Sequence, residues 1–210
     1  MKLYLSSYRI GNEAEELKKW IAKNNNKICI ITNARDYSLD KTWTEQRLAI
    51  DIAQLEDVGF EVSILDLRKY FNNNNKALKN YLKNFNSVYV VGGNTFVLRQ
   101  AMKLSGFDEY LKEKMEDSKF LYCGYSAGIC VLAKDLQGLQ IVDDPHSNPY
   151  GYCETIWEGL GILDYLPLPH FKSDHPESEL IDEEVEYCIK NNIRYRTLQD
   201  GEVIIFNIMR

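Results

Sequence analysis

Residues 120–133 read Phe-Leu-Tyr-Cys-Gly-Tyr-Ser-Ala-Gly-Ile-Cys-Val-Leu-Ala: a short apolar run, a Gly-Tyr-Ser-Ala-Gly turn and a second apolar run. The first run is typical of a buried strand, and the second is compatible with a helix. A G-x-S-x-G turn in that setting is typical of a nucleophile elbow, which holds its serine in a strained, exposed conformation. The turn therefore predicts an α/β protein with Ser126 as its candidate nucleophile. An ordinary glycine-rich turn is the simpler alternative.

The rest of the chain repeats this alternation of strand-like and helix-like segments. Strands are expected at 3–6, 27–32, 60–67, 87–91 and 119–123, and helices at 12–23, 76–85, 95–103 and 177–190. A further helix is expected to start at a Thr42–Glu45 capping box and to end at Gly59. Four crossovers between five strands predict a mostly parallel sheet with helices on both faces, a three-layer α/β/α fold.

The C-terminal part is expected to contain a hairpin, 194–198 and 202–206, joined around Asp200-Gly201. The preceding helix is expected to turn its apolar residues inward and a fringe of acidic residues toward solvent. The inward residues are Leu180, Ile181, Val185, Cys188 and Ile189. The asparagine runs 24–26 and 72–75 are interpreted as turns.

Composition places this chain among ordinary globular proteins. Its 210 residues are 45% hydrophobic and 27% charged, which predicts one domain over residues 1–210. The net charge of −6 and the lack of a basic stripe argue against nucleic acid as a partner, and the apolar runs are too short to span a membrane.

The N-terminal residues have no extended apolar region, so a cytoplasmic location is expected. Five cysteines without a C-x-x-C pair are expected to be reduced core thiols, and we expect neither a cofactor nor a metal ion.

A second glycine-rich turn, Val91-Gly92-Gly93-Asn94-Thr95, follows another predicted strand. The loops beyond the carboxyl ends of parallel strands meet at one edge of the sheet, so this turn is expected near the elbow. The backbone N–H groups of Gly93 and Ala127 are then candidates for an oxyanion hole. A phosphate-binding nest is the alternative, although no G-K-[ST] ending or G-x-G-x-x-G pattern supports nucleotide binding.

A serine nucleophile needs a base, and the chain has three histidines. His170 follows an apolar segment that is expected to form a strand or its end, which would direct its ring to the same edge. His146 lies in a polar loop, and His175 precedes a proline at a helix start, where a capping role explains it. His170 is the candidate base.

Three motifs, Gly-Gly-Asn-Thr-Phe at 92–96, Gly-Tyr-Ser-Ala-Gly at 124–128 and Pro-His-Phe at 169–171, together resemble the dipeptidase E and cyanophycinase family of serine peptidases. The resemblance covers most of the chain and implies a fold like that of class I glutamine amidotransferases, a flavodoxin-like arrangement. It also implies a Ser-His-acid catalytic triad that cleaves small peptides, with Ser126 as nucleophile, His170 as base and Asp200 as acid.

The chain departs from this family at two positions. The family more often has glutamate where Asp200 stands, and Asp-Gly is itself a turn signal, so Asp143 and Asp144 stay candidates for the acid. Family members that cleave after aspartate have an arginine after the histidine, whereas here 171–179 offers only Lys172 among acidic residues. We therefore expect no preference for aspartyl substrates. The local electrostatic field is expected to favour neutral or basic substrates, unless Arg35, Arg99 or Arg194 folds into the pocket.

Two other functions are compatible with the sequence. A binding or regulatory protein could have kept the scaffold without turnover, and a small esterase would use an acid at 143 or 144, between its serine and its histidine. The expected partner is a small peptide substrate, and the expected state is a monomer or a homodimer.

Overall fold

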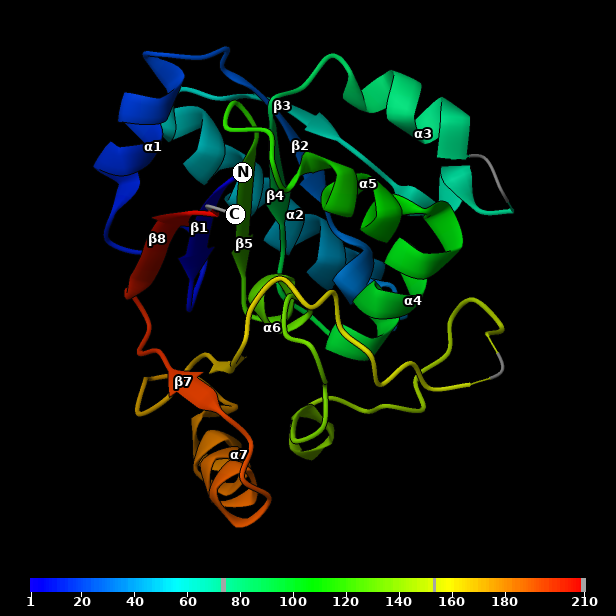
Figure 1. Cartoon of the computed structure of the whole chain (residues 1–210), viewed down its shortest axis with the longest axis vertical. Coiled ribbons are helices and arrows are strands. Elements are labelled where there is room, and N and C mark those ends of the chain that lie inside the picture. Colours follow the sequence, from blue (N-terminus) through cyan, green and yellow to red (C-terminus); the bar gives the residue numbers. More distant parts are fainter. Residues whose placement is uncertain (73–74, 153, 209–210) are drawn as a thin grey trace.

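The computed structural model describes residues 1–72, 75–152 and 154–208. Its main sheet has six strands in the order β3-β2-β4-β5-β1-β8 (Figure 1). These strands are β1 (Lys2–Ser6), β2 (Lys27–Ile31), β3 (Glu61–Ile64), β4 (Ser87–Val90), β5 (Leu121–Tyr125) and β8 (Val203–Asn207). The first five in this order are parallel, and β8 pairs antiparallel with β1. The parallel sheet predicted from the sequence is confirmed, with one antiparallel strand added at its edge.

Helices cover both faces of the sheet. Helices α1 (Ala14–Ile21) and α2 (Lys41–Val58) pack on one face, and α3 (Asn75–Leu82), α4 (Thr95–Ser105), α5 (Phe107–Lys114) and α6 (Ala127–Cys130) pack on the other. Three short 3₁₀ segments are η1 (Asn33–Arg35), η2 (Leu67–Tyr70) and η3 (Leu139–Ile141). The three-layer α/β/α architecture follows from this arrangement.

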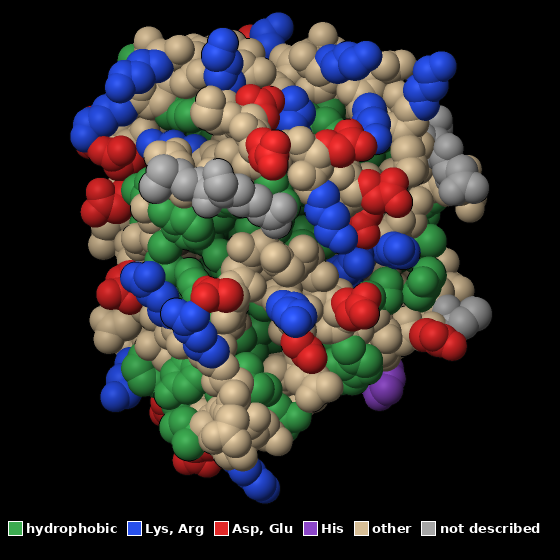
Figure 2. Space-filling view, in the orientation of Figure 1, with side chains coloured by type: hydrophobic (Ala, Val, Ile, Leu, Met, Phe, Trp, Pro, Cys, Tyr) green, Lys and Arg blue, Asp and Glu red, His purple; other side chains and the backbone are tan. Residues whose placement is uncertain are grey.

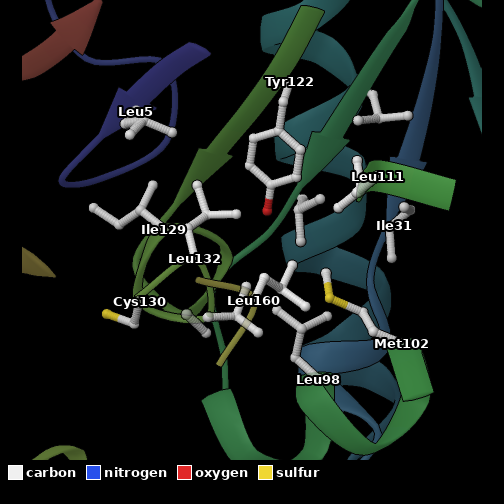
Figure 3. Close-up of a cluster of buried hydrophobic side chains, with 14 of the residues drawn as sticks. Leu5, Ile31, Leu98, Met102, Leu111, Tyr122, Ile129, Cys130, Leu132 and Leu160 are labelled. Carbon is white, nitrogen blue, oxygen red and sulfur yellow. The ribbon is translucent and has the colours of Figure 1, made fainter. Parts of the chain in front are cut away.

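Strand residues alternate between the two faces, because successive side chains of a strand point in opposite directions. In β1, Leu3 and Leu5 join the core beneath α4 and α5, while Tyr4 joins the core beneath α1 and α2. Figure 3 shows part of the first core, where Leu98 and Met102 of α4 lie in the same cluster as Tyr122 of β5. The central strands β4 and β5 are buried at every position, as the sequence indicated, whereas β3 at the edge of the sheet has no fully buried residue.

The elements between Leu166 and Thr197 lie beyond the carboxyl ends of the parallel strands (Figure 1). Strand β6 (Leu166–Leu168) pairs in parallel with β7 (Tyr195–Thr197), and α7 (Ser178–Lys190) connects them. The expected hairpin is wrong, since β7 belongs to this small sheet and β8 belongs to the main sheet. The Asp200-Gly201 turn does form, with Gly201 at φ 98°, but the chains on either side of it diverge.

Two details of the helices also differ from expectation. The side chain of Asp40 accepts a hydrogen bond from the Trp43 N–H at 2.9 Å, so α2 begins at Lys41 and the expected capping box is wrong. In α7, Ile181 and Cys188 are buried as expected, whereas Leu180 and Ile189 are exposed. Glu184 takes an inward position instead and is only 1% exposed, so the acidic fringe is not wholly solvated.

On the face seen in Figure 2, Lys and Arg side chains lie interspersed with Asp and Glu, without a continuous basic stripe. No helix in the described part of the chain is long and apolar enough to cross a membrane. The expected turn at 72–75 and the cysteine at 153 lie partly or wholly outside the described residues.

Candidate active site

The elbow at Ser126 joins β5 directly to α6. Ser126 has φ 48° and ψ −121°, a conformation that is strained for a residue with a side chain. Close packing beneath it requires glycine, since a Cβ atom on Gly128 would lie 2.2 Å from the Val90 carbonyl oxygen and one on Gly124 would lie 2.7 Å from the Gly128 oxygen. The strand-turn-helix context predicted from the sequence is therefore present, including its backbone strain.

The turn after β4 lies against this elbow. A Cβ atom on Gly92 would lie 3.2 Å from Ser126 Oγ, and one on Gly93, at φ 148°, would lie 2.3 Å from the Ala34 carbonyl oxygen. In the described part of the chain, the N–H groups of Gly93 and Ala127 form no hydrogen bond with a protein acceptor. These two amides are free to bind an oxygen of a ligand.

His170 follows β6 and has its ring directed into the site. The residue is 1% exposed and has φ 63°. Its Nδ1 lies 2.7 Å from Asp200 Oδ1, a hydrogen bond in which the imidazole N–H donates to the carboxylate. Within the described structure the ring bonds to this acid and not to Ser126, although Ser126 and His170 line the same pocket. Such a contact often tightens only when substrate is bound.

Of the three candidate acids, Asp200 is the one that contacts His170. Burial acts to raise the pKa of Asp200, but the hydrogen bond and the charge of His170 outweigh it and hold the pKa below its usual range. Asp143 Oδ2 instead accepts the Thr95 N–H at the start of α4, at 2.8 Å, and burial raises the pKa of Asp143 to about 7. Asp144 is exposed, and its Oδ1 accepts the N–H of His146.

Ser7, at the carboxyl end of β1, forms hydrogen bonds with Ser126, His170 and Asp200. Its carbonyl oxygen accepts the Ser126 N–H at 3.2 Å, and its Oγ accepts the His170 N–H at 2.8 Å. The same hydroxyl lies 2.8 Å from Asp200 Oδ1, to which it donates. Ser7 was not among the residues predicted from the sequence, although its place directly after a predicted parallel strand was a signal for it.

The other two histidines behave differently from each other. His146 is exposed and does not line the pocket. His175 stacks on His170 with ring centroids 3.7 Å apart and planes within 9° of parallel. Its Nδ1 also accepts the Glu177 N–H at 3.3 Å, in keeping with the capping role expected before α7. Burial and the adjacent His170 lower the pKa of His175 to about 4, so its ring is neutral near pH 7.

The pocket in front of Ser126 has a volume of about 330 Å³. It is lined by Tyr8, Arg35, Tyr37, Trp43, Arg47, Gly92, Gly93, Tyr125, Ser126, His170, Asp174, His175, Pro176 and Glu177. Lys172, the cation considered from the sequence, does not line it, and its Nζ lies over the Phe171 ring. The pocket cations are instead Arg35, one of the three arginines named as possible, and Arg47 from α2. Among the described residues, His170, His175 and Glu177 are the one group of possible metal ligands whose donor atoms all lie within 4.8 Å of one another.

The cysteines around the elbow are not reactive thiols. Cys123 and Cys130 are buried, and burial raises the pKa of both well above the usual range. Cys130 Sγ also lies 3.5 Å from the Pro167 carbonyl oxygen. Their environment matches the interpretation of these residues as core thiols.

Comparison with known proteins gives matches over most of the chain. A model of peptidase family S51 matches residues 6–207. An uncharacterized peptidase of Listeria monocytogenes is 31% identical over 140 residues, which span 66% of this chain and 64% of the length of that relative. An uncharacterized peptidase of Pasteurella multocida is 29% identical over 84 residues, which span 40% of this chain and 39% of that relative.

Two solved structures share the fold. One is a Listeria monocytogenes protein provisionally assigned as a peptidase E, with a TM-score of 0.74, 21% identity and coverage of 99% of this chain and 98% of the other. The second is a peptidase from an acI-B1 actinobacterium, with a TM-score of 0.65, 16% identity and coverage of 98% of this chain and 83% of the other. At these identities the likeness establishes the fold alone.

Proposed function

The chain belongs to peptidase family S51, and from this premise we propose that it is a serine peptidase that cleaves small peptides through Ser126, His170 and Asp200. The observation that carries the proposal is the His170–Asp200 hydrogen bond of 2.7 Å in a pocket that also contains the strained Ser126. A carboxylate on Nδ1 fixes the tautomer of the imidazole and leaves Nε2 as the proton acceptor.

In the proposed reaction, Ser126 Oγ attacks the carbonyl carbon of the scissile bond while His170 Nε2 takes the hydroxyl proton. The negative oxygen of the tetrahedral intermediate binds the N–H groups of Gly93 and Ala127. His170 then gives its proton to the departing amine, which leaves an acyl ester on Ser126. A water molecule, deprotonated by the same nitrogen, hydrolyses the ester and restores the serine. Asp200 stabilises the charged imidazole in both halves of the cycle.

The chain order of these residues weakens the esterase alternative. An α/β-hydrolase arranges its serine, acid and histidine in that order, which here would require Asp143 or Asp144 to contact His170. Asp143 bonds to α4 and Asp144 to its own loop, whereas Asp200 follows the histidine. The observations thus favour the peptidase reading. A binding protein without turnover differs from it only in activity.

Activity against peptides tests this proposal directly. We expect the purified chain to hydrolyse short peptides, and Ser126→Ala to lose several powers of ten in kcat/KM while a residual rate from the oxyanion site remains. Release of the amine product, followed by mass spectrometry, measures both. Equal rates in the two proteins would overturn the nucleophile assignment, and inactivity of the wild type toward every peptide would favour the binding protein.

The proposed substrate range is not restricted to aspartyl peptides. Arg35 is neutralised by the buried Asp51, with Nη2 2.6 Å from Oδ2. Arg47 donates to Tyr8 at 2.9 Å, and the acidic Asp174 and Glu177 share the pocket. The lining charges are therefore close to balanced, in contrast to the strongly basic site that a buried aspartate side chain needs.

A dipeptide panel tests this specificity. With the leaving residue held constant, we expect Asp-Xaa, Leu-Xaa and Lys-Xaa to differ by less than tenfold in kcat/KM. Arg47 is the cation whose charge the structure leaves without a carboxylate partner among the described residues, so Arg47→Gln is the matched variant. Hydrolysis of Asp-Xaa at least tenfold faster than the others, with that advantage lost in Arg47→Gln, would contradict the proposed range.

A further inference from the structure

The side chains that stand over the site contain a donor set for a metal ion. His170, His175 and Glu177 each offer one ligand atom, and these atoms all lie within 4.8 Å of one another. They come from a single stretch of eight residues, 170–177, between β6 and α7, and all three line the pocket in front of Ser126. We propose that these three residues bind one Zn²⁺ ion reversibly and that the bound ion inhibits the enzyme.

The kind of donor selects the kind of ion. Two imidazoles and one carboxylate favour borderline ions such as Zn²⁺, whereas Mg²⁺ and Ca²⁺ prefer sets made of oxygen alone. Two histidines with one glutamate and an open fourth position also form a common zinc site in proteins. The thiols of Cys123 and Cys130 are buried and protonated, so they offer no competing site beside the pocket.

His170 is already oriented for this role. Its Nδ1 donates to Asp200, so the free lone pair is on Nε2. A carboxylate on the far nitrogen is the usual support of a zinc-binding histidine, since it fixes the tautomer and makes the ligand more basic. Asp200 would therefore support zinc binding and proton transfer by the same hydrogen bond.

Binding requires a movement of His175. Ligands on a tetrahedral zinc ion lie about 3.3 Å apart, so donors separated by up to 4.8 Å must move closer together. Two parallel rings also cannot both direct a lone pair at one ion, so His175 must tilt out of its stack on His170. Glu177 has a side chain that is 42% exposed, and it can move with His175 while the buried His170 stays fixed.

Inhibition follows from the atom that the ion occupies. Zinc on His170 Nε2 takes the lone pair that would accept the Ser126 proton, so this consequence rests on the proposed function, whereas the binding of zinc does not. The ion would act as a reversible inhibitor of the enzyme and not as a cofactor.

Competition with a chromophoric zinc chelator tests the binding. We expect the wild-type chain to take up one Zn²⁺ ion, and both His175→Ala and Glu177→Gln to weaken binding at least tenfold. Exposed His146, outside the pocket, supplies the matched control, and His146→Ala should bind as the wild type does. Thermal melting checks that each variant is folded, and Glu177→Gln keeps the test decisive if His175→Ala is not.

Labelling by a fluorophosphonate probe tests the inhibition without a peptide substrate. Zinc should slow labelling of the wild type at least tenfold, a chelator should restore it, and the labelling of His175→Ala, relative to its own rate without zinc, should not respond. No zinc uptake by the wild type, or unchanged uptake by folded His175→Ala and Glu177→Gln, would overturn the proposal. Zinc uptake that depends on these residues in a protein that never labels would support the metal site and overturn the proposed function.

Discussion

Ser7 connects the groups that the proposed mechanism uses, and its substitution is therefore informative. Its hydroxyl donates to Asp200 and accepts from the His170 N–H. A hydrogen bond to a charged group contributes about 1.5–3 kcal/mol, so Ser7→Ala should lower kcat by about 10- to 100-fold. KM should change little, because Ser7 does not line the pocket. Ser6→Ala is the control, since the Ser6 hydroxyl bonds to the Tyr8 carbonyl oxygen. Equal losses in the two variants, by steady-state kinetics, would contradict the role given to Ser7.

Substitution of Asp200 tests whether this carboxylate supports proton transfer by His170. Asp200→Asn keeps the shape of the side chain but removes the charge and leaves an amide that cannot hold the same imidazole tautomer. We expect a fall in kcat of at least a thousandfold with little change in melting temperature. Asp143→Asn, in which the hydrogen bond to Thr95 can persist, should retain most of the activity. The reverse outcome would reassign the acid to Asp143.

Helix α7 carries a buried carboxyl group that should make the fold sensitive to pH. Glu184 is 1% exposed, one of its oxygens has no partner among the described residues, and burial raises its pKa to about 9. The native state therefore holds a proton that the unfolded chain releases above its ordinary pKa of 4.5. The free energy of unfolding contributed by this group should fall as the pH rises from about 4.5 to about 9.

Melting curves of Glu184→Gln isolate this effect. The wild type should lose stability relative to the variant between pH 5 and pH 9, by at least about 1 kcal/mol, since each unit of pKa difference corresponds to about 1.4 kcal/mol. Glu183→Gln, at the exposed neighbouring position, should follow the wild type at every pH. Parallel pH profiles for all three proteins would mean that Glu184 is ionised in the native state.

Local sequence patterns predicted most of the helices and strands, but not all of their boundaries or the pairing of the strands. The strand expected at 60–67 stops at Ile64, because Asp66 caps η2 through the Arg68 N–H. Asp-Gly correctly indicated a turn at 200–201, yet turn chemistry does not decide which strands pair. Strand β8 pairs with β1, near the N-terminus. Pairing between segments so far apart in the chain leaves no signal in any short stretch of sequence.

For the whole molecule, the alternation of apolar strands with helices was enough to predict the parallel sheet and its two helical layers. The same topology predicted that 92–96 and 126 would meet at one edge, since loops after parallel strands share that edge. His170 was expected at this edge too, but it reaches the site from β6, which pairs with β7 outside the main sheet. The pocket was harder to predict. Arg47 reaches it from α2, and its approach depends on how that helix packs over the sheet. His175 was assigned a capping role, and its stacking on His170 has no signal in the sequence.

The proposed mechanism depends above all on Ser126 acting as a nucleophile that His170 activates. Intact-mass spectrometry after reaction with a fluorophosphonate probe tests it most directly, because the measurement needs no knowledge of the substrate. We expect one adduct per chain, mapped to Ser126, absent from Ser126→Ala and at least tenfold slower to form in His170→Ala. Equal labelling of all three proteins, or an adduct on another residue of the wild type, would contradict it.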